Sequence, residues 1–134
     1  MKKILYVLFV IAILTCSVSV SFAADAINNT TDLNQAVSQA QKDNKTIMLV
    51  FDQDGCYYCD LLKKDVLSNN DVISKLNEGF ITVVVDINSQ PQLAAKYHVV
   101  GTPTMIFLDS NQKEINKIEG YVDAGEFLNT IKGM

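Results

Sequence analysis

Apolar residues beyond the N-terminal region form short blocks that polar segments separate. The blocks at 47–51 and 81–85 are nearly continuous and of strand length, which is typical of strands covered on both faces. Leu33, Ala36 and Ala40 recur at helical spacing and predict a helix before the first block. The whole pattern predicts helices at 32–43, 57–67, 71–77, 91–96 and 124–132, and strands at 46–52, 80–87, 104–108 and 113–119.

The order of these elements predicts an α/β fold. Helices and strands alternate in the first half, which indicates parallel strands joined by right-handed crossovers. The last two strands are separated by Asp109-Ser110-Asn111-Gln112, a turn composition that makes them antiparallel. We therefore expect one domain with a central mixed sheet of about four strands flanked by helices. The polar segment 25–30 is expected to be a linker.

Residues 1–23 have the pattern of a signal peptide. Two lysines precede an apolar stretch at 4–14, and the small residues Ser21 and Ala23 flank a cleavage position. The apolar region is also close to the lower length of a membrane span, so a retained N-terminal anchor stays open. A third alternative is lipid attachment at Cys16, whose surroundings loosely resemble those of bacterial lipoproteins.

The remaining domain, 24–134, is acidic. Removal of Lys2 and Lys3 moves the formal net charge from −4 to −6. An acidic domain without basic clusters argues against partners such as nucleic acid or anionic lipid. Lys63 and Lys64, on one predicted helix, are expected to be solvated. Export would place this domain in a periplasmic or other extracytoplasmic compartment, where disulfides persist.

Two cysteines carry the candidate chemistry. The motif Cys56-Tyr57-Tyr58-Cys59 follows a predicted strand and begins a predicted helix. At this spacing two sulfurs either close a small disulfide ring or open to a dithiol, and a helix N-terminus favours the thiolate. A redox centre is the first hypothesis, and a purely structural disulfide is the alternative. Two cysteines and the distant His98 fall short of a four-ligand zinc site, so no metal is expected.

Three features give the chain a resemblance to thioredoxin-fold proteins over residues 30–132. They are the cysteine motif at a strand-to-helix junction, the segment Val100-Gly101-Thr102-Pro103-Thr104, and Gly120 before the last helix. The segment is similar to the family's loop that bears a cis proline. The combination of the motif with this loop, in this strand order, is more specific than the motif alone.

The resemblance is strongest to exported members of the family. Gly55-Cys56-Tyr57-Tyr58-Cys59 is similar to the pattern Gly-Cys-Pro-Tyr-Cys of periplasmic thioredoxin-like proteins. Residues 66–72 resemble the thioredoxin-like domain of membrane thiol:disulfide interchange proteins. An exported thiol–disulfide oxidoreductase that reduces protein disulfides is therefore the implied function.

The resemblance also implies a role for each site residue. Cys56 would be the nucleophile and Cys59 the resolving cysteine. The residues expected to contact substrate are Thr102, Pro103, Tyr57 and Tyr58. The redox-active disulfide would be the only prosthetic element, and the protein would act as a monomer. Because no nicotinamide or flavin motif is visible, electrons would come from a membrane electron carrier.

Alternative functions stay open on the same scaffold. The couple would run in the opposite direction in a disulfide oxidase, and both ways in an isomerase. An alternative from another class is a binding module or chaperone in which Cys56 and Cys59 form a structural disulfide. A ring this small closes little chain, so its contribution to stability would be modest, which argues against a structural role.

Two departures from ordinary thioredoxins affect the chemistry. The chain has no tryptophan, and Val50 and Val84 occupy the positions of the family's buried aspartate and its lysine partner. Replacement of both is coherent, since either charge alone would be buried without its partner. The group that takes the proton of Cys59 is then open. Asp52 and Asp54 are candidates by proximity in sequence, unless both are simply solvated loop carboxylates.

Overall fold

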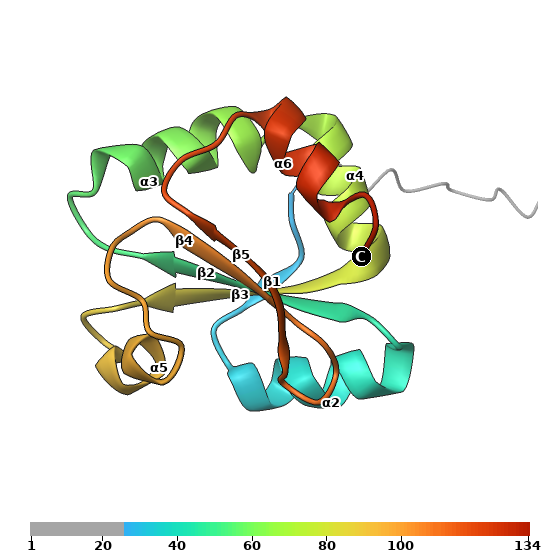
Figure 1. The fold of residues 1–134 in the computed structure, drawn as a ribbon. Coiled ribbons are helices and arrows are strands. Elements are labelled where there is room, and N and C mark those ends of the chain that lie inside the picture. The colour runs from blue at the N-terminus through green and yellow to red at the C-terminus, as the bar shows by residue number, and fades with distance from the viewer. Residues whose placement is uncertain (1–25) are drawn as a thin grey trace, which may run out of the picture.

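The computed structural model describes residues 26–134. The predicted signal peptide at 1–23, the alternative anchor and the alternative lipid site at Cys16 all lie outside the described residues. Apart from the first strand, the elements of the described chain follow one another in the predicted order (Figure 1). They are β1 (Asn29–Thr30), α2 (Leu33–Asp43), β2 (Thr46–Asp52), α3 (Tyr57–Leu61), the π-helix η1 (Leu62–Val66), α4 (Asn70–Gly79), β3 (Phe80–Asp86), α5 (Pro91–Lys96), β4 (Thr104–Leu108), β5 (Glu114–Glu119) and α6 (Ala124–Ile131).

The strands form one mixed sheet in the order β1-β3-β2-β4-β5. The first three run parallel, whereas β4 is antiparallel to β2 and β5 is antiparallel to β4. These directions confirm the predicted mixed α/β sheet. The two predicted blocks at 47–51 and 81–85 pair with each other along their whole length, at the centre of the sheet.

The mixed sheet expected to have about four strands has five, because Asn29–Thr30, in the segment expected to be a linker, forms an edge strand. Asn29 and Thr30 pair in parallel with Thr82 and Val83 of β3. Asn77 holds the approach to this strand, since its side chain accepts from the backbone N–H of Asn28 at 2.9 Å. Two residues are too few to show the alternation of apolar and polar positions that predicts a strand. Both are polar, and the residue that holds them in place, Asn77, is distant in sequence.

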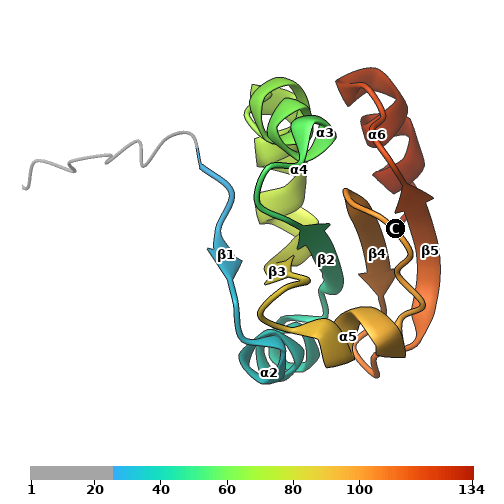
Figure 2. The same cartoon turned by 90° about the vertical axis from the view of Figure 1, so that its left-hand side faces the viewer.

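Helices cover both faces of the sheet, as Figures 1 and 2 show: α3, η1, α4 and α6 lie on one face, and α2 and α5 on the other. Alternate residues of β2 face the two layers, which explains the continuous apolar block. The first core contains Met48, Val50, Leu62, Val66, Val72, Leu76, Phe80, Met105, Phe107, Ile118, Phe127 and Ile131. The second contains Ala36, Ala40, Ile47, Leu49, Phe51, Val83, Val85, Ala94, Tyr97, Ile106 and Leu108.

The helix predicted at 57–67 is confirmed in position, and it changes from an α-helix to a π-helix after its first turn. It begins as α3 and continues as the π-helix η1, in which the N–H of Leu67 donates to the carbonyl of Leu62 at 2.9 Å. Leu62 and Val66 are both buried. Because two residues four apart share a face in either kind of helix, the apolar pattern does not distinguish them.

Candidate active site

The cysteine motif lies where β2 ends and α3 begins. The loop 53–55 makes the reversal, and Gly55 adopts a positive φ of 74° that side chains disfavour. The N–H of Cys56 donates to the carbonyl of Gln53 at 3.3 Å and closes the turn. Cys56 is the residue that caps α3, in extended conformation. The strand-to-helix placement predicted from the sequence is therefore confirmed.

Cys56 and Cys59 are joined by a disulfide, with their Cα atoms 5.2 Å apart. The N–H of Cys59 donates to the Cys56 sulfur at 3.2 Å, so this sulfur occupies the place of a helix-capping acceptor. Cys56 is half-buried, whereas Cys59 is only 1% exposed. A negative charge on the first sulfur would be stabilised by the free N–H groups of the helix start. The second sulfur is accessible mainly to the first.

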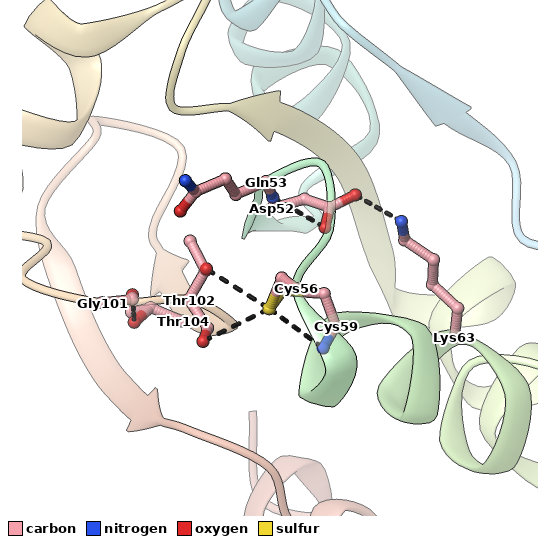
Figure 3. Close-up of a disulfide and its surroundings, with 8 residues drawn as sticks. All are labelled: Asp52, Gln53, Cys56, Cys59, Lys63, Gly101, Thr102 and Thr104. Atoms are coloured by element: carbon pink, nitrogen blue, oxygen red, sulfur yellow. Dashed lines mark hydrogen bonds and ion pairs between the residues drawn. A yellow bond between two sulfur atoms is a disulfide. The ribbon is translucent and has the colours of Figure 1, made fainter.

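Thr102 brings the loop before β4 onto the same sulfur (Figure 3). Its hydroxyl donates to the Cys56 sulfur at 3.4 Å, and its carbonyl oxygen lies 3.5 Å from that sulfur. In the disulfide this sulfur has no proton to donate, but a reduced thiol would have one for the carbonyl. The two residues are 46 positions apart in sequence. The structure thus brings the predicted loop against the predicted cysteine.

The loop that carries Thr102 is fixed at both ends. The Thr102–Pro103 peptide bond is cis, and Pro103 is buried. The Pro103 carbonyl accepts from the N–H of Gly120, directly after β5, at 2.8 Å. The hydroxyl of Thr104 donates to the carbonyl of Gly101 at 2.7 Å. Gly120 therefore holds the loop 100–104 in place, so two of the features on which the sequence resemblance rests are in contact.

Asp52, at the end of β2, forms an ion pair that the sequence analysis missed. Lys63 places its Nζ 2.5 Å from one carboxylate oxygen of Asp52, and the N–H of Gln53 donates to the other at 2.8 Å. Lys63 is exposed, as expected, and it also reaches Asp52 because the first turn of η1 passes beside the end of β2 (Figure 3). Asp54, the other candidate carboxylate, is exposed in the loop.

Val50 and Val84 are direct neighbours in the parallel pairing of β2 with β3. Val50 is 3% exposed and belongs to the core on the face that α3 covers. The structure therefore places these two apolar residues side by side in the sheet. The nearest charged pair along β2 is instead Asp52 with Lys63, at the rim of the sheet.

A group of three tyrosines, two of them exposed, flanks the disulfide. Tyr57 and Tyr58 are 71% and 57% exposed, and their rings meet edge to face at 5.2 Å. Tyr121, after β5, extends the group, with its ring centroid 6.4 Å from that of Tyr58. Loss of solvent raises the pKa of the Tyr121 phenol, and the negative charges of Asp65 and Asp123 raise it further. Sequence analysis missed Tyr121 because its contact with Tyr58 is long-range.

His98 takes no part in a cluster of metal-ligating side chains. It is exposed after α5, in left-handed conformation, and its carbonyl accepts from the Lys117 side chain at 3.3 Å. Among residues 26–134, no three or more His, Cys, Asp or Glu side chains gather in a way that holds a metal ion. Over the same residues, every helix is too short or too polar to cross a bilayer.

Replacement of Thr102 by valine tests the contact between its hydroxyl and the sulfur. Valine keeps the shape but removes the donor to a thiolate, so we expect the pKa of the reduced Cys56 thiol to rise. Alkylation by iodoacetamide at pH 7, in a Cys16→Ser background, should slow about threefold to tenfold. The difference should close above about pH 9.5, where a thiol is ionised in either variant.

Thr130→Val is the matched control, because the Thr130 hydroxyl donates to Glu126 on the exposed side of α6. Its alkylation rate should equal that of the parent. Equal rates for the Thr102 variant and the parent at every pH from about 3.5 to 9.5 would show that the hydroxyl does not act on Cys56.

Comparison with known proteins agrees with this geometry. The chain is 36% identical over 106 residues to the thiol:disulfide interchange protein DsbD of Photorhabdus laumondii, and 35% identical over 111 residues to that of Campylobacter jejuni. These alignments cover 75% and 81% of this chain but 18% and 19% of those proteins. The chain thus spans about a fifth of the length of the curated relatives it matches.

Solved structures share the fold. A thioredoxin from Thermus thermophilus has a TM-score of 0.72 and 26% identity, with 82% of this chain and 87% of that chain covered. The oxidised C-terminal domain of DsbD from Neisseria meningitidis has a TM-score of 0.65 at 23% identity, over 81% and 97% of the two chains. The sequence pattern of the thioredoxin-like domain matches residues 33–134, and this chain therefore belongs to the thioredoxin-like domain family.

Proposed function

We propose that the protein is a thiol–disulfide oxidoreductase that reduces protein disulfides through Cys56 and Cys59. One observation carries the proposal: a disulfide at the start of α3 presents one sulfur beside the Thr102 loop and keeps the other buried. The similarity to proteins named thiol:disulfide interchange protein supports the same chemistry.

The reaction consists of two exchanges. The Cys56 thiolate attacks one sulfur of a substrate disulfide, and the other substrate sulfur leaves as a thiolate that takes a proton from water. Cys59 then loses its proton and attacks the Cys56 sulfur of the mixed disulfide. The second substrate thiolate leaves, and Cys56 and Cys59 are again a disulfide. Two electrons pass from the protein to the substrate.

The residues around Cys56 would hold the substrate. The backbone of Thr102 lies beside the sulfur and offers hydrogen bonds to an extended substrate segment, which would dock as an added strand. The cis bond to Pro103 sets the direction of the loop that carries this backbone. Tyr57 and Tyr58 would contact apolar parts of the same segment, since both rings are exposed beside the disulfide. Tyr121 enlarges this aromatic surface.

The protein would act in an extracytoplasmic compartment, such as the periplasm, as a monomer. Residues 1–23 would direct export or anchor the chain, and 24–134 would form the thioredoxin-like domain. A membrane electron carrier with a reactive dithiol would reduce the Cys56–Cys59 disulfide after each cycle. The similarity to part of DsbD, a larger protein, supports an exchange partner of this kind.

The redox potential of the couple, measured together with insulin reduction, tests the proposal. We expect turnover of insulin in the presence of dithiothreitol and a potential of about −270 mV, as in thioredoxin. A potential near about −120 mV would favour an oxidase instead. Absence of turnover, with a potential below about −300 mV, would contradict the proposal and favour a structural disulfide in a binding module.

A further inference from the structure

The Asp52 carboxylate is held by fixed partners on both oxygens. Lys63 lies 2.5 Å from one oxygen, and the N–H of Gln53 donates to the other at 2.8 Å. The Asp52 side chain is 16% exposed and that of Lys63 is 50% exposed, so the pair is partly shielded from water. Because Asp52 is largely covered and is oriented by a second hydrogen bond, this ion pair differs from a solvated surface pair.

The two partners belong to different elements of the fold. Asp52 pairs with Asp86 in the central sheet, and its carbonyl accepts from the N–H of Ile87 at 3.0 Å. Lys63, in contrast, lies in η1, which follows the five-residue helix α3. A π-helical turn departs from the usual hydrogen-bond ladder, so tertiary contacts have a larger share in fixing its position.

The position of Cys59 depends on what holds α3 and η1 to the sheet. Leu62 and Val66 pack into the core on the inner side of these helices. Lys63 follows Cys59 by four residues, about one helical turn, and ties that turn to the end of β2 (Figure 3). The ion pair therefore joins the turn of the resolving cysteine to the strand that leads into the Cys56 loop.

We propose that Asp52 and Lys63 are positioning residues that hold the Cys59 sulfur in line for its attack on Cys56. This inference rests on the proposed redox function. In the resolving step the proton of Cys59 goes to water, the Cys59 sulfur bonds to that of Cys56, and the bond from Cys56 to the substrate breaks. The first attack, by Cys56 on the substrate, needs neither residue.

A positioning role and a pure charge effect predict different changes in the rate of the resolving step. Loss of either partner frees the same turn, so both variants slow the resolving step if the pair positions Cys59. If the pair acted only by charge, Asp52→Asn would leave the Lys63 ammonium to favour the Cys59 thiolate, whereas Lys63→Met would leave a carboxylate that disfavours it. The two variants would then change the rate in opposite directions.

The variants are chosen to remove the charge and little else. Asp52→Asn keeps the shape and an oxygen for the Gln53 N–H, and Lys63→Met keeps most of the side-chain stem. Lys63→Arg keeps the ion pair and is the conservative rescue. Asp43→Asn is the matched control, because Asp43 is exposed at the end of α2, on the other face of the sheet, and is in no ion pair of the described chain.

The experiment follows two exchanges with 5,5′-dithiobis(2-nitrobenzoate) as probe. The full chain, reduced and carrying Cys16→Ser, is mixed with the probe in a mild detergent. Attack by Cys56 releases one coloured thiolate, and attack by Cys59 on the mixed disulfide releases the second. The rates of the two phases report the two steps separately. Urea unfolding of each variant checks that the fold is retained.

We expect the second phase to slow about tenfold in both D52N and K63M, with the first phase unchanged. The double variant D52N/K63M should be no slower than either single variant, because the two residues act as one unit. K63R and D43N should resolve at the parental rate. A second phase that is unchanged, or that changes in opposite directions, would overturn the positioning role. If the parent releases only one equivalent of the coloured thiolate, Cys59 does not resolve the mixed disulfide and the proposed function itself fails.

Discussion

Replacement of Cys56 by serine should abolish insulin reduction, lowering turnover by about a thousandfold or more. Serine is nearly the same size, so the capping position at the start of α3 is kept and serine is itself a good N-cap. A hydroxyl at this position is not ionised at pH 7, however, and cannot attack a disulfide as a thiolate does. The measurement is the rate of insulin precipitation with dithiothreitol as reductant.

Cys59→Ser is the matched variant for the other sulfur. It should keep the first attack but lose resolution, so a mixed disulfide between Cys56 and the substrate should accumulate on non-reducing gels. Turnover in Cys56→Ser near that of the parent, or a mixed disulfide formed by Cys59 when Cys56 is present, would contradict the assigned order. The two variants together separate the nucleophile from the resolving cysteine.

Replacement of Phe107 by alanine should destabilise the fold by about 3–5 kcal/mol. Phe107 is fully buried in β4, and its ring lies 6.0 Å from that of Phe80 and 6.3 Å from that of Phe127. It therefore joins the start of β3 and the helix α6 to the centre of the sheet. Alanine would leave a cavity between β3, β4 and α6, and these three elements cannot all move inward to fill it. Urea unfolding of the oxidised protein measures the change.

Ile115→Ala on β5 is the control for this substitution. Ile115 is 47% exposed, so loss of its side chain should change the free energy of unfolding by less than about 0.5 kcal/mol. A loss of less than about 1 kcal/mol for the Phe107 variant would show that the core relaxes around the missing ring. The activity of the folded Phe107 variant should stay close to that of the parent, because Phe107 does not contact the disulfide.

Because Val50 and Val84 are both apolar, neither of them can exchange a proton with the buried cysteine. A carboxylate in the core requires a partner, whereas two valines pack without cost in unpaired charge. The charged pair of this site lies at the rim instead, where Asp52 and Lys63 are partly hydrated. The geometry favours a role in holding the helix over a role in accepting a proton from Cys59, since both oxygens of Asp52 are already engaged.

The sequence by itself determined the order of the main elements, the mixed sheet and the place of the reactive motif. Each of these rests on a local signal. The blocks at 47–51 and 81–85 are readable because burial on both faces makes the whole strand apolar. The motif at 56–59 is readable because a strand, a glycine at a positive φ and a helix start follow one another directly.

Only the tertiary structure decided which distant residues meet at the sulfur and beside it. The contact of Thr102 with Cys56, the pairing of Lys63 with Asp52 and the position of Tyr121 against Tyr58 all join separate elements. No period along the chain encodes them, because they depend on which strand lies next to which and on how η1 turns. For the same reason the two-residue strand β1 is visible only through its partner β3.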